Sequence, residues 1–536
     1  MKMNAPSQRN GFPLSRRRFV GEMLLLGGAG VFQAHSVAQT LPAASGIGST
    51  VRDFGARGDG LALETKALQA AIEACARAGG GVVYVPPGKY LTGTLFLKSH
   101  VTLHLSAGAT LLGSSNLEDY PVTVPSVRSY TDTYTERSLI YGENLENVTL
   151  EGRGVIDGQG GRFQGPYKVR PYLVRLIASR DVTVRDVTLK DSAMWVQHYL
   201  ACDGLSVEGL RVESRCNANN DGLDIDGCQR VRVAHCDIRS GDDAIVLKST
   251  LDRPCRDVVI SNCVLSSDCN AFKIGTESNG GFEDIILSNC SIYDTRLAGL
   301  ALEMVDGGSL ERVTISDVTM RNVRGAVFIR LGNRARPFKS GAARPGMGRL
   351  RQVRISNVQA DGADSIGCSI TGLPEQAVED ISLDNISISF SGGGLARDAQ
   401  AKLPERPEQY PEYGMFGRLP AYGFYCRHAR GLRLKDMRLE LRALDARPAL
   451  VCSDVRDLEL FAWRAGPSGE SPAVVLRDSR DVFIHGCWAV PNTRTYLRVE
   501  GKESKNIRLV ANQLAEAGQV VDLDPAVPST AVHLEP

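Results

Sequence analysis

Short segments in which apolar and polar residues alternate recur along most of the chain. Examples are DVTVRDVTL, DVVISNCVL and RVTISDVTM, and an apolar–polar period of two is typical of a half-buried β-strand. Most neighbouring segments begin 23 to 28 residues apart. The twelve segments have their first apolar residues at Val182, Leu205, Val231, Val258, Ile285, Val313, Val353, Ile381, Leu432, Leu458, Val482 and Ile507.

Repeats of this length predict a solenoid. No stretch between the segments is long enough, or suitably patterned, for a helix in each repeat. Three short strands per repeat, stacked on the same strands of the next repeat, form an all-β, right-handed parallel β-helix. One coil cannot bury its apolar face alone, but stacked coils bury a continuous core.

Two sets of residues at matching places in successive repeats support this arrangement. Cys236, Cys263 and Cys290 are spaced by 27 residues, each three residues after an apolar strand position. We expect one residue type to fill one position per coil when parallel strands stack. A nearly equivalent place in later repeats is taken by Asp317, Asn357 and Asn385.

The repeat is interrupted at two places. A helical pattern from Glu64 to Ala78, ended by GGG, has apolar residues along one side and would cap the open end of the solenoid. Residues 391–424 form a loop rich in Pro, Gly and Tyr. This loop is either a disordered insertion or one wall of a groove, and its five aromatic residues favour the wall. We therefore expect a single β-helix domain over 39–536.

Residues 1–38 predict a targeting segment. Ser15-Arg16-Arg17-Arg18-Phe19 precedes the weakly apolar run VGEMLLLGGAGVF, which resembles a twin-arginine export signal. The run is too short to span a membrane. The alternative is an ordinary secretory peptide, and both interpretations predict a periplasmic or secreted protein.

Composition narrows the function. A net charge of +1 over 536 residues gives no indication of a nucleic-acid or membrane partner. The 13 cysteines include no CxxC pair and no zinc spacing. We expect them to be buried and unpaired, and we expect a monomer that needs no metal or other cofactor.

Two acidic turns dominate the candidate chemistry. Asn219-Asn220-Asp221-Gly222 and Gly241-Asp242-Asp243 each lead into a short strand, and Asp221 and Asp242 are 21 residues apart. Either turn alone is ordinary turn chemistry. At this spacing the two turns should lie on neighbouring coils, where like charges repel and at least one carboxyl pKa should rise.

These turns resemble glycoside hydrolase family 28, the polygalacturonases and their relatives. Asn219-x-Asp221-Gly222, then Gly241-Asp242-Asp243 with a strand and Lys-Ser, match the family pattern, and Trp195-x-x-His198 matches it upstream. The resemblance implies an inverting hydrolase acting on a pectic polysaccharide or oligosaccharide. Asp242 would be the general acid, and Asp221 and Asp243 would activate water.

The chain departs from that family downstream of the turns. Asn270 stands where the family has histidine, and Lys273 where it has serine. Both are candidate substrate-binding residues, as is Asn219 in the first acidic turn. The family's Arg-Ile-Lys, which binds the galacturonate carboxylate, is Ala301-Leu302-Glu303 here. A rhamnogalacturonan or a decorated oligosaccharide therefore fits better than plain polygalacturonate.

Strand parity suggests other substrate-binding residues. Lys248, Lys273, Glu303 and Arg330 are predicted to point outward on one face of consecutive coils. Lys273 and Arg330 would bind a uronate carboxylate or sugar hydroxyls, and Glu303 would bond a hydroxyl, unless the four residues form a surface salt-bridge ladder. Trp195 and His198 either line a sugar site or pack at a coil corner.

Two other functions stay open. The first is a calcium-dependent pectic lyase on the same scaffold, with calcium on Asp221 and Asp242 and Lys273 as the base. The second is a carbohydrate-binding β-helix without catalysis.

Overall fold

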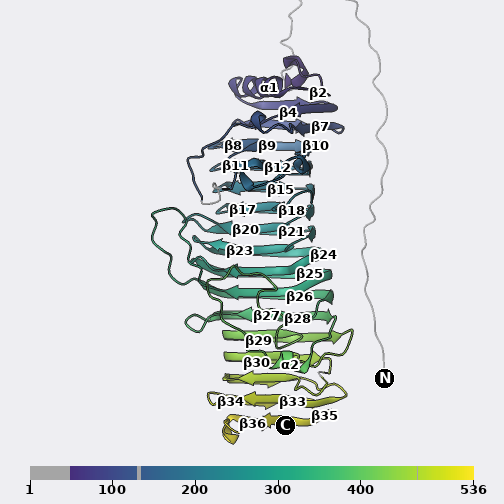
Figure 1. Cartoon of the computed structure of the whole chain (residues 1–536), viewed down its shortest axis with the longest axis vertical. Coiled ribbons are helices and arrows are strands. Elements are labelled where there is room, and N and C mark those ends of the chain that lie inside the picture. Colours follow the sequence, from purple (N-terminus) through teal and green to yellow (C-terminus); the bar gives the residue numbers. More distant parts are fainter. Residues whose placement is uncertain (1–48, 130–133, 468, 536) are drawn as a thin grey trace, which may run out of the picture. The chain divides into compact units, whose positions relative to one another are not determined.

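The described part of the chain is an elongated stack of parallel strands (Figure 1). The computed structural model describes residues 49–129, 134–467 and 469–535. The described residues, from Ser49 onward, form one compact unit, and every pairing between its named strands is parallel. The predicted targeting segment, 1–38, lies outside the described residues.

The predicted repeat register is the observed one. Val182 pairs with Leu205, Leu205 with Val231, and so on without exception through to Ile507. All twelve positions are at most 2% exposed. The parallel β-helix is therefore confirmed, with a core that runs continuously through the stack.

The elements have the following bounds. The helices are α1 (Thr65–Arg77) and α2 (Ala396–Ala399), with 3₁₀ turns η1 (Val51–Phe54), η2 (Leu117–Asp119), η4 (Gly160–Arg162), η5 (Tyr167–Val169) and η6 (Ser529–Ala531). The strands are β1 (Ser49–Thr50), β2 (Asp59–Leu63), β3 (Gly81–Val85), β4 (Gly88–Thr92), β5 (Leu95–Phe96), β6 (Val101–Leu105), β7 (Ala109–Gly113), β8 (Ser138–Glu143), β9 (Glu146–Gly152), β10 (Val155–Asp157), β11 (Tyr172–Ile177), β12 (Arg180–Arg185), β13 (Thr188–Lys190), β14 (Gln197–Leu200), β15 (Asp203–Glu208), β16 (Arg211–Ser214), β17 (Leu223–Asp226), β18 (Gln229–Ala234), β19 (Asp237–Ser240), β20 (Ile245–Ser249), β21 (Cys255–Ser261), β22 (Val264–Ser267), β23 (Phe272–Ser278), β24 (Phe282–Met304), β25 (Ser309–Leu331), β26 (Arg349–Ala363), β27 (Cys368–Thr371), β28 (Val378–Phe390), β29 (Phe424–Leu441), β30 (Leu450–Ala465), β31 (Val474–Arg477), β32 (Arg480–His485), β33 (Thr493–Glu500), β34 (Lys505–Val510), β35 (Ala517–Leu523) and β36 (Val532–Glu535).

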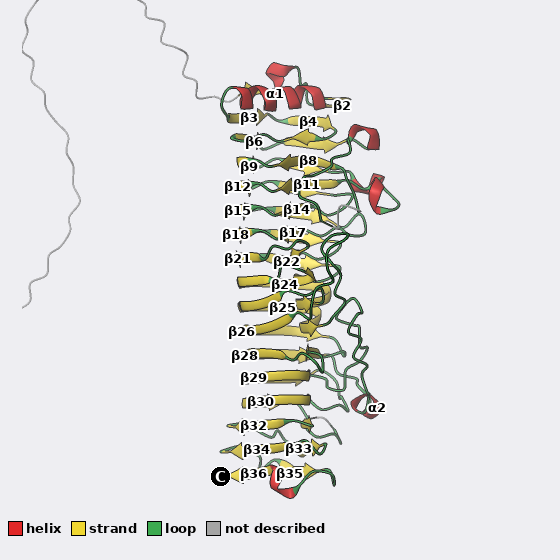
Figure 2. Cartoon of the chain, turned by 90° about the vertical axis from the view of Figure 1, so that its left-hand side faces the viewer, coloured by secondary structure: helices red, strands yellow, loops and turns green. Residues whose placement is uncertain are grey.

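Helix α1 covers one end of the stack, as predicted (Figure 2). Its apolar side buries Leu68, Ala71, Ile72 and Cys75 against the first coils. The helix therefore shields core and strand edges that a solenoid would otherwise expose at its end.

A ladder of Asn and Asp side chains marks one corner of the later coils. Asn357 donates to Asp317 at 2.9 Å, and Asn385 donates to Asn357 at 2.8 Å. These three residues, like Asn289, have positive φ, which Asn and Asp tolerate better than other non-glycine residues. They correspond to Asn289, one residue before the Cys290 position, since Val318 pairs with Cys290.

The insertion lies between the end of β28 at Phe390 and the start of β29 at Phe424. Its side chains and backbone pack on the outer face of the preceding strands. Tyr413 donates to the backbone oxygen of Arg324 at 2.9 Å, and Arg427 donates to that of Leu403 at 2.7 Å. The ordered residues of the insertion therefore cover a sheet face that would otherwise be open to solvent, and loops gather on that side in Figure 2.

All 13 cysteines are free thiols, and all but the half-buried Cys216 are buried. This confirms the expectation that they are buried and unpaired. Among the described helices, none is both long and apolar enough to cross a membrane.

Candidate active site

The two acidic turns are stacked on neighbouring coils. Asp242 donates its backbone N–H to Asn220 at 3.3 Å, and Gly222 donates to the backbone oxygen of Asp243 at 2.8 Å. The strands that follow the turns, β17 and β20, pair directly. The repeat thus brings three aspartates from two places in the sequence to one point.

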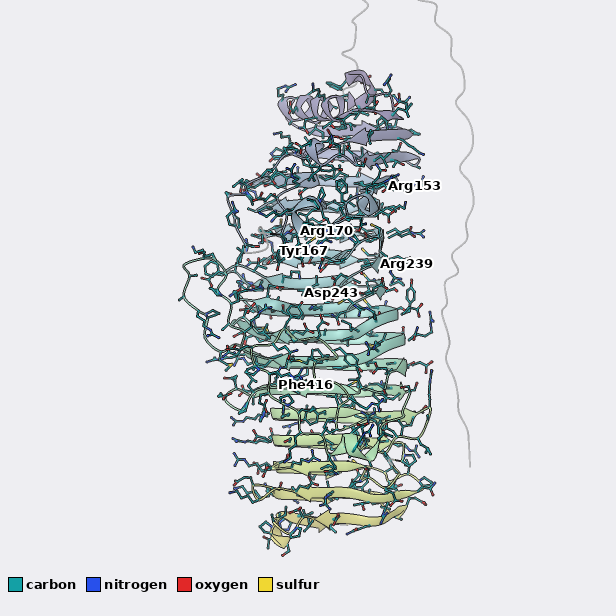
Figure 3. All side chains as sticks on the ribbon, viewed as in Figure 1. Arg153, Tyr167, Arg170, Arg239, Asp243 and Phe416 are labelled. Carbon is teal, nitrogen blue, oxygen red and sulfur yellow. The ribbon has the colours of Figure 1, made fainter. Side chains whose placement is uncertain are left out.

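A cavity of about 540 Å³ opens in front of these turns. We call it the aspartate cavity. Along the long axis of the molecule, Asp243 lies between Tyr167 and Phe416 (Figure 3). The lining residues are Tyr134, Tyr167, Met194, Trp195, Asn219, Asp221, Asp242, Asp243, Lys248, Cys269, Lys273, Glu277, Arg296, Leu297, Tyr410, Glu412 and Gly414.

The three aspartates differ in their proton affinity. Burial, followed by the charge of Asp243, raises the pKa of Asp242. Burial also raises the pKa of Asp221 far above its usual range. Burial acts on Asp243 too, but Lys273 and then Lys248 outweigh it and lower the pKa of that carboxyl. The carboxyl groups of Asp242 and Asp243 are therefore shifted in opposite directions: Asp242 holds its proton more tightly than an ordinary aspartate, and Asp243 less tightly.

Lys273 is the cation that separates these pKa values. Its ammonium group lies 3.1 Å from Asp243 and 3.5 Å from Glu303. It also donates to the hydroxyl of Tyr410 at 3.1 Å. The side chain is 1% exposed, so these contacts act with little screening by water.

Lys248 is a second buried cation in the cavity. Its ammonium group lies 3.6 Å from Asp224 and 3.5 Å from Glu277. It also lies 4.8 Å from the centre of the Trp195 ring, a cation–π contact. Because neither ion-pair distance is that of a tight hydrogen bond, the ammonium group keeps donors for a ligand.

Aromatic rings also line the cavity, and the Trp195 ring lies against Lys248. Tyr134 and Tyr167 stack with their centres 4.9 Å apart, and Tyr134 meets Trp195 edge-on. Tyr167 is 39% exposed. Exposed rings beside carboxylates and cations are suited to a polar ligand with apolar faces, such as a sugar.

Seven of the eleven predicted site residues line the aspartate cavity. Asn219 is among them, and its side-chain oxygen accepts from Arg170 at 3.0 Å. The seven are Trp195, Asn219, Asp221, Asp242, Asp243, Lys248 and Lys273.

His198 and Asn270 lie behind the cavity wall rather than in it. The ring of His198 is fully buried and 3.3 Å from Asp226. Asn270 is also fully buried, and its amide donates to Asp243 at 2.8 Å. The burial of His198 favours packing at the coil corner, the alternative left open for it. Asn270 was expected to contact substrate, but it is enclosed and orients Asp243 instead.

Glu303 and Arg330 are likewise absent from the cavity lining, against the prediction of direct sugar contacts. Glu303 is buried beneath Lys273. Arg330 donates to the backbone oxygens of Gly372 at 3.0 Å and Glu405 at 2.5 Å. The insertion covers this part of the face, so Arg330 anchors the insertion instead of facing solvent.

The register of the outward side chains also differs from the prediction. Lys273 pairs with Val246 and Ala301, whereas Glu303 pairs with Arg330. Along the strand direction, Lys273 is therefore offset by two residues from Lys248 and Glu303, although all three point to the same face of the sheet. Lys273 pairs with Val246, two residues before Lys248. The register then shifts after Leu247, and Glu277 lies beside Lys248.

Two residues of the insertion complete the cavity and were not predicted. Tyr410 is 42% exposed, and Lys273 and Arg334 lie 5.2 and 5.5 Å from its ring centre. Glu412 brings a further carboxyl, whose pKa is raised by burial. The aromatic content of the insertion was the only sequence signal for them, and it gave no register.

Among the described residues, one group of side chains could hold a cation. Oxygens of Asp242 and Asp243 and the sulfur of Cys269 lie within 4.8 Å of one another. Calcium takes six to eight oxygen ligands, and thiol sulfur suits softer metals. This donor set fits calcium poorly, and the ammonium group of Lys273 already neutralises Asp243.

Glu303→Gln tests the buried charge beneath the cavity. Burial raises the pKa of Glu303 to about 8. A raised carboxyl pKa means that the folded state holds the proton, so this group's contribution to stability is lost as pH rises from about 4.5 to 8. We expect Glu303→Gln to flatten the fall in unfolding free energy over that window by about 1–3 kcal/mol. Urea unfolding at a series of pH values measures it, and an unchanged slope would contradict the expectation.

Comparison with known proteins points to the family that the acidic turns resemble. The family model of glycosyl hydrolases family 28 matches residues 75–404. A probable polygalacturonase of Vitis vinifera is 35% identical over 220 residues, 37% of this chain and 44% of that protein. An exo-poly-α-D-galacturonosidase of Dickeya chrysanthemi is 41% identical over 118 residues, 20% of this chain and 19% of that protein.

The fold is shared with a hyperthermoactive exopolygalacturonase of Thermotoga maritima. The TM-score is 0.58 at 22% identity, over 73% of this chain and 91% of that one. The chain spans less than half the length of the two curated relatives it matches.

Proposed function

Since this chain belongs to glycosyl hydrolases family 28, we propose that it hydrolyses glycosidic bonds of a pectic polysaccharide or oligosaccharide. The observation that carries the proposal is the opposite displacement of two adjacent carboxyl pKa values in one cavity. Such a pair supplies an acid and a base at the same pH.

Asp242 is the proposed general acid, because its raised pKa keeps a proton for the departing glycosidic oxygen. Asp243 is the proposed base, because Lys273 keeps it ionised. It would take a proton from the water that attacks the anomeric carbon, with inversion. Asp221 has a raised pKa and one buried oxygen without a hydrogen-bond partner among the described residues, which suits it to bind that water.

A uronate is the proposed sugar at the cleavage site. The relatives from grape and Dickeya are named for galacturonan. In this chain the carboxylate would meet Lys248 and the exposed Arg296, both of which line the cavity. Because Ala301 and Glu303 replace the family's cations, a rhamnogalacturonan or decorated oligosaccharide remains the proposed alternative substrate.

Cleavage from a chain end is the proposed mode of action. Tyr410, Glu412 and Gly414 of the insertion line the aspartate cavity. A wall at this point would stop a polysaccharide from continuing along the face. The names of the Dickeya and Thermotoga proteins also denote exo action.

Tyr410→Ala tests the role of that wall. We expect KM for oligogalacturonides to rise about tenfold, since aromatic burial against a ligand contributes on the order of 1 kcal/mol or more. Tyr410→Phe keeps the ring and removes only the hydroxyl that accepts from Lys273, so we expect a smaller rise. Initial rates over a substrate series measure both, and equal KM values for all three proteins would exclude a sugar contact.

Product analysis tests the function itself. Polygalacturonate and rhamnogalacturonan oligosaccharides are digested side by side, and reducing ends and unsaturated-sugar absorbance are followed together. We expect new reducing ends without absorbance. Absorbance that rises with cleavage would establish the calcium-dependent lyase, and binding without turnover of either substrate would favour a carbohydrate-binding protein.

Export by the twin-arginine route is the proposed path to a periplasmic or secreted location. That route carries folded proteins. The 13 unpaired cysteines are consistent with folding in a reducing compartment before export.

A further inference from the structure

A second cavity lies on the same sheet face, nearer the C-terminus. It has a volume of about 400 Å³, and we call it the arginine cavity. Its floor is formed by side chains at one register position of successive coils. Arg427 pairs with Ser453, Ser453 with Arg477 and Arg477 with Glu500. The lining residues are Gln400, Ala401, Lys402, Leu403, Glu405, Tyr425, Arg427, His428, Ser453, Arg477 and Glu500.

The insertion separates the two cavities and lines both. Residues 400–405 line the arginine cavity, and residues 410–414 the aspartate cavity. Lys273 and Tyr425 are four coils apart in the strand register. At about 4.8 Å per coil, this places the cavities on the order of 20 Å apart.

The charges in the arginine cavity are mixed, with a positive excess. Lys402, Arg427 and Arg477 face Glu405 and Glu500. Arg477 pairs with Glu500 at 2.7 Å, and Arg427 with Glu405 at 3.1 Å. Lys402 has no ion pair among the described residues, so one positive charge remains for a ligand.

Two buried polar atoms in this cavity have no hydrogen-bond partner in the described structure. They are the Nε of Arg427, a side chain that is 5% exposed, and one carboxylate oxygen of Glu405. The guanidinium is held in place by the backbone oxygens of Leu403 and Pro404. Arg427 is therefore fixed at the cavity by the insertion, and its Nε is not used by any described residue.

We propose that the arginine cavity is a second sugar site, which binds a carboxylated sugar. The sugar carboxylate is recognised by Lys402 and Arg427. Ring hydroxyls bond to Glu405 and Ser453, which line the cavity. A neutral sugar would leave the positive charge of Lys402 without a partner. A dianion such as phosphate would be repelled by the carboxylates of Glu405 and Glu500.

This site gives an acidic polysaccharide a second point of attachment, which raises the affinity of the whole protein for the polymer. The inference rests on the proposed function only for the choice of galacturonate as the probe.

Crystals of the full chain soaked with D-galacturonate, and separately with D-galactose, test the proposal. We expect galacturonate in the arginine cavity with its carboxylate against Arg427, and no galactose there at the same concentration. An empty arginine cavity, or equal filling by both sugars, overturns the inference.

The aspartate cavity of the same crystals keeps the two proposals apart. Galacturonate only in the aspartate cavity ends the second-site inference and leaves the proposed function. Galacturonate only in the arginine cavity supports the inference and counts against a galacturonate-binding active site.

Lys402→Glu supplies the matched test of charge. Lys402 is exposed, so the fold is retained. We expect the galacturonate concentration for half occupancy of the arginine cavity to rise about tenfold. Lys502→Glu, the same charge change at an exposed lysine outside the cavity, should leave it unchanged, and equal effects of both variants would contradict specific recognition.

Discussion

Replacing Asp242 with Asn is expected to lower kcat on the true substrate by about 10²–10⁴-fold, the usual contribution of a general acid. Asn has nearly the same shape and retains a hydrogen-bonding oxygen, but it cannot give a proton to the leaving oxygen. KM should change little, because the half-buried side chain lies at the reacting bond in this mechanism. Steady-state rates and the binding of an oligosaccharide to the inactive variant measure the two effects separately.

Asp257→Asn is the matched control. Asp257 is exposed, has positive φ and pairs only with the neighbouring Arg256 at 3.4 Å. Asn is well tolerated at positive φ, so this variant should keep full activity. If Asp242→Asn also kept full activity, Asp242 would not be the acid, and Glu412 would be the next carboxyl to consider.

Lys273→Met is expected to lower the unfolding free energy by about 3–5 kcal/mol, as when one partner of a buried ion pair is removed. It leaves Asp243 without the cation that lies 3.1 Å away and lowers its pKa. Lys435→Met removes a half-exposed pair with Glu459 at 3.1 Å, and should cost no more than about 1 kcal/mol. Denaturant unfolding compares the two variants.

The same Lys273→Met substitution should move the acid side of the pH–rate profile. Without Lys273, burial raises the pKa of Asp243, so the base becomes protonated at higher pH than in the original protein. The acidic limb should therefore shift to higher pH. An unshifted limb would show that Asp243 is not the base.

Adding Glu303→Gln to Lys273→Met tests the contact between these two side chains, whose Nζ and Oε2 atoms lie 3.5 Å apart. The two changes together form a double-mutant cycle. Strict additivity of the two single effects would contradict the buried pair.

The fold could be predicted because its signal is repeated. A single alternating segment is ambiguous, but twelve segments at a near-constant interval determine the pairing of Val182 through Ile507. The boundaries of the insertion were visible for the same reason, as the place where the period fails. Its path over the sheet was not, because the contacts of Tyr410 and Tyr413 are made with distant coils.

Site residues could be predicted from the sequence only where they belong to the repeating coils. Asp221, Asp242 and Asp243 are placed by the stacking of neighbouring turns. Arg330 was misplaced because strand parity gives the direction of a side chain but not what covers it. Glu277 and Lys248 became neighbours through a register shift, which no count of residues in the sequence reveals.

The insertion changes the way in which the stack holds together. In a solenoid each coil contacts only its neighbours, so stability is a sum of local terms and opening can start at either end. Here the insertion forms hydrogen bonds with Lys273, Asn333 and Arg330, and its residue Leu403 accepts one from Arg427. The insertion therefore links coils that are not in direct contact with one another. The coils that carry the aspartate cavity and the arginine cavity are therefore coupled into one cooperative unit, while the coils beyond Arg477 are free to fray from the C-terminal end.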